Sequence, residues 1–262
     1  MAERLKVPTP SRRMGAQAAA AVLSRLHRDS EAEDVLADVI HGEYPGGTAL
    51  VSSFGAESAV LLHMISRIAP DLPVLFLETG MLFPATLAYQ QRLARELGLR
   101  DVRLIRPDPE ELAEDDPLGE LHSYAPDACC HLRKTLPLRR ALAPFEAWIS
   151  GRKRFQTTER SAIEVFEVEQ DTGRARLKVN PLASWSATRL RAYMARHTLP
   201  AHPLVARGYL STGCMPCTSP VKPGEDPRAG RWRGRAKAEC GIHIDAGVVR
   251  RPAGHPASPP PR

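Results

Sequence analysis

Short β-branched runs and longer apolar stretches with helical spacing alternate along the first half of the chain. Ser30 and Glu33 have the spacing of a helix-capping box, and the apolar positions behind them recur at helical intervals, which predicts a first helix. Residues 48–53 form a β-branched run between glycines, which is typical of a buried strand. A stretch of helical length follows from Glu57. The pattern therefore begins with a helix, a strand and a second helix.

The same alternation continues through two more strands. Residues 74–78 and 101–105 are short apolar runs, and residues 84–97 between them have helical length and spacing. Strands that alternate with helices predict a mostly parallel sheet flanked by helices, with the strand ends brought to one edge by right-handed crossovers. Ligands of such sheets bind at the carboxyl ends of the strands, here residues 52–57 and 78–83.

The second half of the chain has a less regular pattern. Residues 107–126 are acidic and lack periodicity, which indicates a loop or a short helix, and the chain after Leu204 is rich in Gly, Pro and Arg. The remaining predicted elements are a helix over 130–143, strands over 147–151 and 163–168, and a helix over 186–197 capped by Ser184 or Ser186. The pattern thus predicts one α/β domain followed by a loop-like segment.

Composition limits the class of protein. The 262 residues are 43% hydrophobic, which is enough for one large domain with an appended tail. No stretch approaches the roughly 20 apolar residues of a membrane helix. The apolar patch 16–23 has no signal-peptide cleavage pattern behind it. We therefore expect a cytoplasmic protein without a membrane partner.

The net charge of +6 predicts affinity for anions. Nucleic acid, membrane lipid and a small phosphorylated substrate all fit this charge. The densest basic run, 228–237, lies among Gly, Pro and Trp instead of on a helical face. This arrangement favours a loop folded around a compact anion over a groove for nucleic acid.

The loop 52–58, Ser-Ser-Phe-Gly-Ala-Glu-Ser, joins the first predicted strand to a helix. Backbone N–H groups and hydroxyls in such a loop point toward an anion on the helix N-terminus, so the loop is a candidate phosphate site. A Ser/Gly turn of this kind also occurs without any ligand, and the loop alone does not decide between the two interpretations.

The five cysteines divide into two pairs and a single residue. Cys129 and Cys130 are adjacent, Cys214 and Cys217 have the Cys-x-x-Cys spacing, and Cys240 stands apart. Distant cysteine pairs most often converge on one metal centre. Adjacent thiolates strain a single tetrahedral zinc ion, whereas a cubane cluster offers them separate iron atoms. Buried or redox-paired thiols without metal are the alternative.

Cys240 lies close to the basic run. Nearby cations lower the pKa of a thiol and favour the nucleophilic thiolate, so Cys240 is a candidate nucleophile. A lone cysteine near a chain end is also often incidental.

The chain carries, in this order, the motifs SSFGAES, FLETGMLFPAT, CCHLRKTLPL, WISG, KVNPLASWS, GCMPCTSPVKPGEDPRAGRW and ECGIH. Together they resemble the adenylyl-sulfate and phosphoadenylyl-sulfate reductase family over roughly residues 30–245. The resemblance implies an adenine nucleotide alpha hydrolase-like fold, a mostly parallel sheet flanked by helices, with a flexible C-terminal segment. It also implies a thioredoxin-dependent reduction of adenylyl sulfate to sulfite and AMP through an S-sulfocysteine on Cys240.

The resemblance implies roles for further residues. Ser52 and Ser53 match the family's pyrophosphate loop, and Gly151 closes the nucleotide pocket. The segment beside the adenosine is represented by Leu77, Thr79 and Gly80. The residues that face the phosphosulfate correspond to Lys134, Arg228, Arg231 and His243. These cations suit the chemistry, because a phosphosulfate repels an attacking thiolate unless its charge is neutralised.

The iron–sulfur branch of the family carries both cysteine pairs, so Cys129, Cys130, Cys214 and Cys217 are expected to bind a 4Fe-4S cluster. Their presence favours adenylyl sulfate over its 3′-phosphorylated form. The stretch 151–156 departs from the Gly-x-Arg-Arg-Asp-Gln of many relatives, because Phe155 replaces the acidic residue. A phosphoadenylyl-sulfate or dual-specificity enzyme therefore remains an alternative.

The expected organisation has four parts: a partly disordered lead-in over 1–29, a nucleotide-binding domain over 30–205, a cluster-ligand and catalytic segment over 206–247, and a disordered tail over 248–262. No nucleic-acid partner is expected, and homo-oligomerisation stays open. Two rival functions are an ATP pyrophosphatase of the tRNA-thiolation type and a non-catalytic iron–sulfur redox sensor. The loop 52–58 lacks the second glycine and the aspartate of the pyrophosphatase motif.

Overall fold

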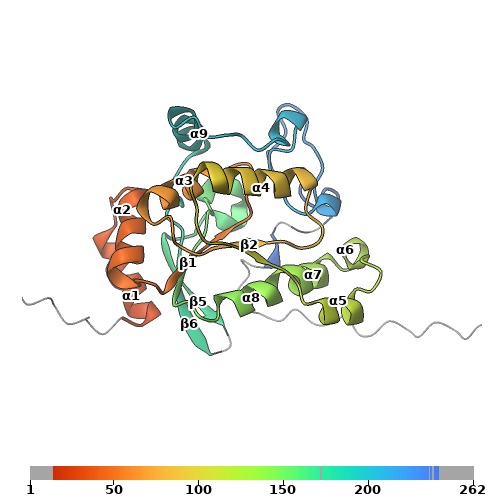
Figure 1. Cartoon of the computed structure of the whole chain (residues 1–262). Coiled ribbons are helices and arrows are strands. Elements are labelled where there is room, and N and C mark those ends of the chain that lie inside the picture. The colour runs from red at the N-terminus through yellow and green to blue at the C-terminus, as the bar shows by residue number, and fades with distance from the viewer. Residues whose placement is uncertain (1–13, 172, 236, 238, 242–262) are drawn as a thin grey trace, which may run out of the picture.

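A six-stranded sheet forms the centre of the computed structural model, which describes residues 14–171, 173–235, 237 and 239–241 (Figure 1). Its strands are β1 (Thr48–Ser52), β2 (Val74–Leu77), β3 (Val102–Ile105), β4 (Ala147–Ile149), β5 (Phe166–Asp171) and β6 (Arg174–Val179). They lie in the order β3-β2-β1-β4-β6-β5, and only β5 runs antiparallel to its neighbour. The predicted mostly parallel α/β fold is thus confirmed.

Helices cover both faces of this sheet. The helices are α1 (Ala16–Leu26), α2 (Ala32–Ala37), α3 (Ser58–Ile68), α4 (Pro84–Glu96), α5 (Pro109–Asp115), α6 (Leu121–Tyr124), α7 (Pro126–Cys130), α8 (Leu136–Leu142) and α9 (Ala187–Arg196). Two π-helical turns, η1 (Asp38–Glu43) and η2 (His131–Thr135), extend α2 and join α7 to α8. Short 3-10 turns are η3 (Arg154–Gln156), η4 (Thr158–Arg160), η5 (Val205–Arg207) and η6 (Met215–Cys217).

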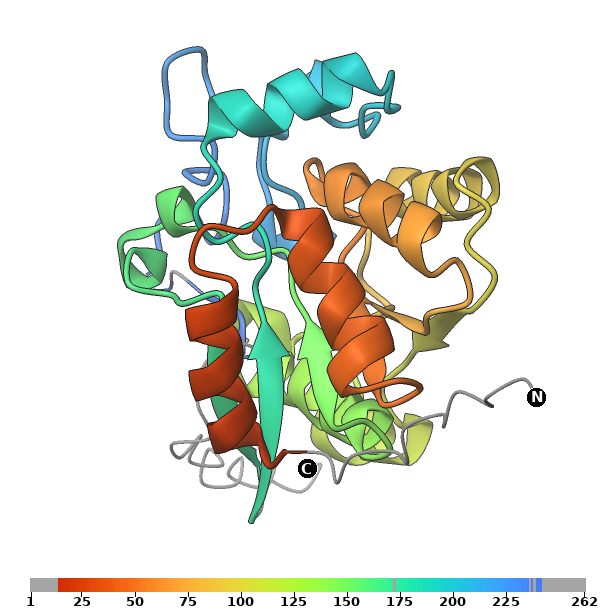
Figure 2. The ribbon, with the colours of Figure 1, turned by 90° about the vertical axis from the view of Figure 1, so that its left-hand side faces the viewer.

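Alternate side chains of the central strands enter two separate cores. Leu50 and Phe76 pack with α2 and α3 on one face, and Val51 and Trp148 pack with α8 on the other. Every residue of β1, β2 and β4 is buried, as expected for parallel strands covered on both faces. The strands β4 and β6 point toward the end of the molecule where α9 and the C-terminal segment lie (Figure 2).

Most elements of the first half match the prediction. The strands near 48–53, 74–78 and 101–105 and the helices from Glu57 and over 84–97 are all present. The helix predicted over 186–197 is α9, and the Ser186 side chain accepts from the Arg189 N–H at 3.1 Å. The strand predicted over 163–168 is β5, which begins and ends three residues later.

The capping box predicted at Ser30 and Glu33 is wrong. The helix α2 takes Glu31 as its N-cap, and this side chain makes no capping hydrogen bond. Ser30 lies one residue outside, where its hydroxyl is 3.1 Å from the ring Nδ1 of His27. A local polar partner therefore replaces the helix N-terminus as the contact of this serine.

Two elements escaped prediction. The helix α1 lies inside the segment 1–29 and packs Ala16, Ala19 and Leu23 inward, so that small alanines make up most of its buried stripe. The apolar pattern of the strand β6 is interrupted by charged residues, of which Arg176 is paired with Asp171 at 3.1 Å.

The helix predicted over 130–143 is divided among α7, η2 and α8. Across the described ranges, none of the helices has the length and apolarity needed to cross a bilayer. The tail predicted over 248–262 lies outside the described residues.

Candidate active site

A cavity of about 1020 Å³ opens at the carboxyl ends of β1, β2 and β4. Its wall combines the loops after these strands with residues of α9 and of the segment that follows Leu204. The predicted site residues that line it are Ser52, Ser53, Leu77, Thr79, Lys134, Gly151, Arg228, Arg231 and Cys240. Gly80 is next to this wall without lining it, and His243 lies outside the described residues.

The loop after β1 is fixed by hydroxyl groups. The Phe54 N–H donates to Ser52 Oγ at 3.2 Å and the Gly55 N–H donates to Ser58 Oγ at 2.9 Å. Phe54 is fully buried at a φ of +47°, a left-handed conformation that a bulky residue keeps only when packing enforces it. The loop therefore has a fixed shape that leaves Ser53 on the cavity wall.

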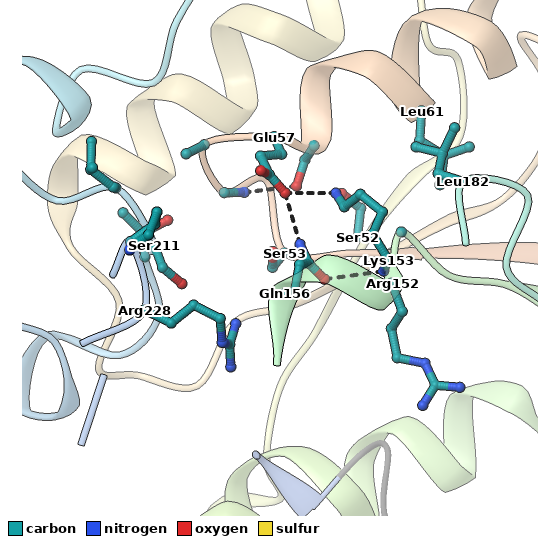
Figure 3. Close-up of a pocket in the computed structure, with 18 of the residues that line it drawn as sticks. Ser52, Ser53, Glu57, Leu61, Arg152, Lys153, Gln156, Leu182, Ser211 and Arg228 are labelled. Carbon is teal, nitrogen blue, oxygen red and sulfur yellow. Dashed lines mark hydrogen bonds and ion pairs between the residues drawn. The ribbon is translucent and has the colours of Figure 1, made fainter. Parts of the chain in front are cut away.

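An internal ion pair lies beside this loop. Glu57 precedes α3, and its Oε2 atom is 2.7 Å from Lys153 Nζ and 2.7 Å from Gln156 Nε2. Figure 3 shows both side chains pointing at Glu57. Burial lowers the pKa of Lys153, while Glu57 acts in the opposite direction. Sequence reasoning missed this cluster, although Lys153 and Gln156 lie in the stretch 151–156 that was singled out as altered.

Further cations line the same cavity. Lys134 comes from η2 and is buried. Burial alone would lower the pKa of Lys134, but negative charge on Cys214, Cys240 and Cys130 raises it, and the net direction is upward. The Arg231 guanidinium donates to the Thr212 carbonyl at 3.0 Å and lies 4.4 Å from the Trp232 ring centroid. A side chain at Gly213 would collide with this guanidinium, so the glycine makes room for it.

Cys240 is half-buried and also lines the cavity. The neighbouring Glu239 forms an ion pair with Arg160, and both of these residues also line the cavity. Neither was singled out from the sequence. Arg160 has no spacing signal of its own, but Glu239 stands inside the ECGIH motif, directly before the cysteine.

The two cysteine pairs lie near one another. Cys214 is tied to the loop after β2, because Met215 N–H donates to the Met81 carbonyl at 2.7 Å and Thr79 Oγ1 is 3.3 Å from Cys214 Sγ. Burial raises the pKa of Cys129 to about 12, and the charges of Cys130 and Cys214 add to this effect. All five cysteines are free thiols.

In the part of the chain that the structure describes, no group of three or more His, Cys, Asp or Glu side chains is set to hold one metal ion. The four paired cysteines nevertheless come from two segments that the fold brings together, α7 and η6.

Comparison with known proteins identifies the family. Residues 47–220 match the model of the phosphoadenosine phosphosulfate reductase domain. Adenosine 5'-phosphosulfate reductase of Mesorhizobium japonicum is 49% identical over 88% of this chain and 89% of its own. Phosphoadenosine 5'-phosphosulfate reductase of Gloeobacter violaceus is 42% identical over 84% of this chain and 92% of its own.

Solved structures agree with this assignment. The phosphate complex of phosphoadenylyl-sulfate reductase from Candida auris has a TM-score of 0.65 and 26% identity, covering 79% of this chain and 98% of its own. FMN adenylyltransferase of Candida glabrata, at 12% identity and a TM-score of 0.51 over 82% of this chain and 80% of its own, shares the fold alone. Sequence and structure therefore agree that the chain belongs to the phosphoadenosine phosphosulfate reductase domain family.

Proposed function

We propose that this protein reduces adenylyl sulfate to sulfite and AMP in sulfate assimilation, with Cys240 as the nucleophile and thioredoxin as the reductant. The observation that carries the proposal is that Cys240, Lys134, Arg228 and Arg231 all line the cavity at the strand ends. The naming of the Mesorhizobium japonicum relative supports the choice of substrate. Reduction by thioredoxin belongs in the cytoplasm, where thiols are kept reduced.

The nucleotide half of the substrate fits the sheet side of the cavity. Leu61, Leu77 and Leu182 supply apolar surface for an adenine ring, and Ser53 supplies a hydroxyl at the loop after β1. A Cβ atom at Gly151 would lie 3.7 Å from the Leu61 side chain, so a larger residue there would narrow this part of the cavity. The phosphosulfate then extends toward Lys134, Arg228 and Arg231.

In the first step the Cys240 thiolate attacks the sulfur atom of adenylyl sulfate. A sulfur–sulfur bond forms, the bond from that sulfur to the bridging oxygen breaks, and AMP leaves with the electron pair. Lys134, Arg228 and Arg231 neutralise the substrate's negative charge and stabilise the charge that develops on the phosphate. The product is an S-sulfocysteine on Cys240.

In the second step a thiolate of thioredoxin attacks the Sγ atom of Cys240. The bond to the sulfite group breaks, and sulfite leaves with the electron pair. The second thioredoxin thiol then resolves the mixed disulfide and restores Cys240. Oxidation of this dithiol to a disulfide supplies the two electrons of the reduction.

Cys129, Cys130, Cys214 and Cys217 would hold a 4Fe-4S cluster. The donor set fits, because it consists of thiols alone and the charge of Cys214 acts on both Cys129 and Cys130, as expected for two neighbouring pairs. When bound, the cluster would cross-link α7 to η6 and keep a fixed negative charge beside Lys134. The buried Lys134 then contributes its ammonium to the substrate's anionic end.

The cluster is tested by metal analysis of anaerobically purified protein. We expect brown protein with iron and acid-labile sulfide in matched amounts. Cys214→Ser should lose both, and Cys240→Ser is the matched control that should keep both. Stoichiometric zinc without sulfide would contradict the proposal.

A 3′-phosphorylated substrate is the second candidate, favoured by the Gloeobacter violaceus relative and by the cationic stretch 152–154. The charges of that stretch are engaged, however. Arg152 pairs with Glu167, Lys153 with Glu57 at 2.7 Å, and Arg154 with Glu164 at 3.4 Å. Because these carboxylates already neutralise the cations, the stretch offers little attraction for an extra phosphate.

The deciding experiment compares turnover of the two nucleotides with thioredoxin present. Adenylyl sulfate should have the higher kcat/KM. A preference for the 3′-phosphorylated nucleotide would assign the second function, and turnover of neither would reject both.

A further inference from the structure

Glu239 is held by a buried guanidinium. The carboxylate lies 2.5 Å from Arg160 Nε through Oε1 and 2.7 Å from Arg160 Nη2 through Oε2. The side chains of Arg160 and Glu239 are only 9% and 12% exposed. A bidentate pair of this kind is strong and directional, so it fixes the backbone of the residue that carries it. Cys240 is the next residue of the chain.

The same carboxylate faces a second arginine. Arg228 Nη2 lies 4.0 Å from Glu239 Oε2. Arg160, Arg228 and Glu239 all line the cavity, and Arg160 Nη1 is also 2.5 Å from Gln156 Oε1. Glu239 thus presents an internal anion to guanidinium groups on the wall where an anionic substrate would bind.

We propose that Glu239 is a positioning residue that competes with the substrate: its carboxylate holds Cys240 against the cavity through Arg160 and yields this guanidinium, with Arg228, to the anionic end of the nucleotide. The inference rests on the proposed function. Binding of the anion and release of the Cys240 segment are then coupled, because one guanidinium cannot form its best bidentate contact with both carboxylate and substrate. This exchange would loosen the segment once the nucleotide is bound.

The competition makes an unusual prediction for affinity. Glu239→Gln removes the internal anion, so it should tighten binding of adenylyl sulfate, by about tenfold, the factor that corresponds to about 1.4 kcal/mol. Adenosine carries no anion and should bind with unchanged affinity. Both dissociation constants are measured by titration calorimetry in the full-length, cluster-containing Cys240→Ser protein, in which no reaction interferes.

Matched variants separate competition from a structural effect. Glu225→Gln removes another carboxylate of the same segment, which pairs with Arg233 away from the cavity wall, and should change neither affinity. Glu239→Asp keeps the charge and should return the affinity for adenylyl sulfate toward that of the parent protein. It also serves as the second test if Glu239→Gln does not fold, because its shorter reach predicts an intermediate tightening.

In the Cys240 enzyme, Glu239→Gln should lower KM and leave kcat nearly unchanged, since the substrate loses its competitor and Glu239 has already released Arg160 in the bound enzyme. Unchanged or weaker binding of adenylyl sulfate by Glu239→Gln, or equal changes for adenosine, would overturn the competition. Failure of the proposed function is a different result, in which the parent protein itself binds no adenylyl sulfate and forms no adduct on Cys240.

Discussion

The sheet edge and the C-terminal segment build one cavity by different physical means. The loops at the sheet edge follow strands whose residues are all buried, so the apolar core sets their position. In the segment after Leu204, the described residues form only short 3-10 turns and two isolated bridges, Leu82 with Cys214 and Thr218 with Arg231. Ion pairs and the buried ring of Trp232 hold the described part of this segment in place instead of an apolar core. The fold thus supplies the nucleotide surface, and polar contacts supply the reactive group.

Trp232 is the apolar anchor of the segment. It is 3% exposed, and its backbone N–H donates to the Cys217 carbonyl at 3.0 Å. Lys237 Nζ lies 5.5 Å from the centroid of its ring. Farther along, Lys237 pairs with Asp127 next to the cysteine pair of α7. Because these contacts are ionic or local, they can exchange with a ligand or a partner at a lower cost than core packing can.

The strongest test of this comparison is the reactive residue itself. Cys240→Ser replaces the thiol by a hydroxyl that is scarcely ionised at neutral pH, so turnover should fall by at least about 10³-fold while the fold is retained. Mass spectrometry should find a stable gain of one SO₃ group on Cys240 in the parent protein without thioredoxin, with one AMP released per site. The serine variant should form no adduct. An adduct on another residue, or normal turnover by the variant, would disprove the covalent role.

A substitution in the sheet core should instead lower the stability of the fold. Phe76 is fully buried in β2, with its ring centroid 5.1 Å from that of Phe54 in the cavity loop. Phe76→Ala should lower the free energy of unfolding by about 3–5 kcal/mol, because it removes apolar contacts and leaves a cavity. Urea unfolding measures the loss. Leu104→Ala on the neighbouring strand β3, at a side chain that is 41% exposed, is the control and should change stability far less. Equal losses at both positions would mean that the sheet core is not what sets the stability.

The sequence predicted the sheet edge better than the segment, for a physical reason. Buried parallel strands such as β1 and β2 are short apolar runs, and their period is visible in one sequence. The pairings of Glu57 with Lys153 and of Arg160 with Glu239 join residues 96 and 79 positions apart, since 153 minus 57 is 96 and 239 minus 160 is 79. No local pattern encodes such contacts. The cysteines were found by their type and spacing, and Arg228 and Arg231 followed from the motif resemblance, whereas neither signal singled out Arg160 or Glu239.

His202, a buried histidine, makes the free energy of unfolding depend on pH. His202 accepts from the Leu204 N–H at Nδ1, 3.2 Å away, and its Nε2 lies 3.1 Å from Thr86 Oγ1, which fits a neutral ring. Burial lowers the pKa of His202 from 6.5 to about 4. The unfolded chain therefore binds a proton that the folded protein excludes. The neutral His202 ring therefore makes its full contribution to the free energy of unfolding above pH 6.5. That contribution declines as the pH falls toward 4.

The expected loss is about 1.4 kcal/mol for each pH unit inside this window. His202→Gln keeps a polar side chain that does not titrate, so its unfolding free energy should fall less steeply than that of the parent protein between pH 6.5 and 5. Parallel pH profiles for the two proteins would show that His202 does not titrate in this range.

The smallest expected effect concerns Phe155, which is 45% exposed at the cavity wall, where the family resemblance led us to expect an acidic residue. Phe155→Asp adds a negative charge to the cavity rim. A 3′-phosphorylated nucleotide carries more negative charge than adenylyl sulfate and should be repelled more strongly, wherever its extra phosphate lies within the cavity. Because the added carboxylate is solvated, the difference should be below about 1 kcal/mol, or up to about fivefold in the ratio of the two kcat/KM values. Phe155→Asn has nearly the same shape as Phe155→Asp but carries no charge. It therefore measures how far loss of the aromatic ring alone changes the ratio of the two kcat/KM values. If both variants change the ratio equally, loss of the aromatic ring and not the added charge governs discrimination between the two nucleotides at this position. Apolar contact, as at the sheet edge, would then matter more here than charge.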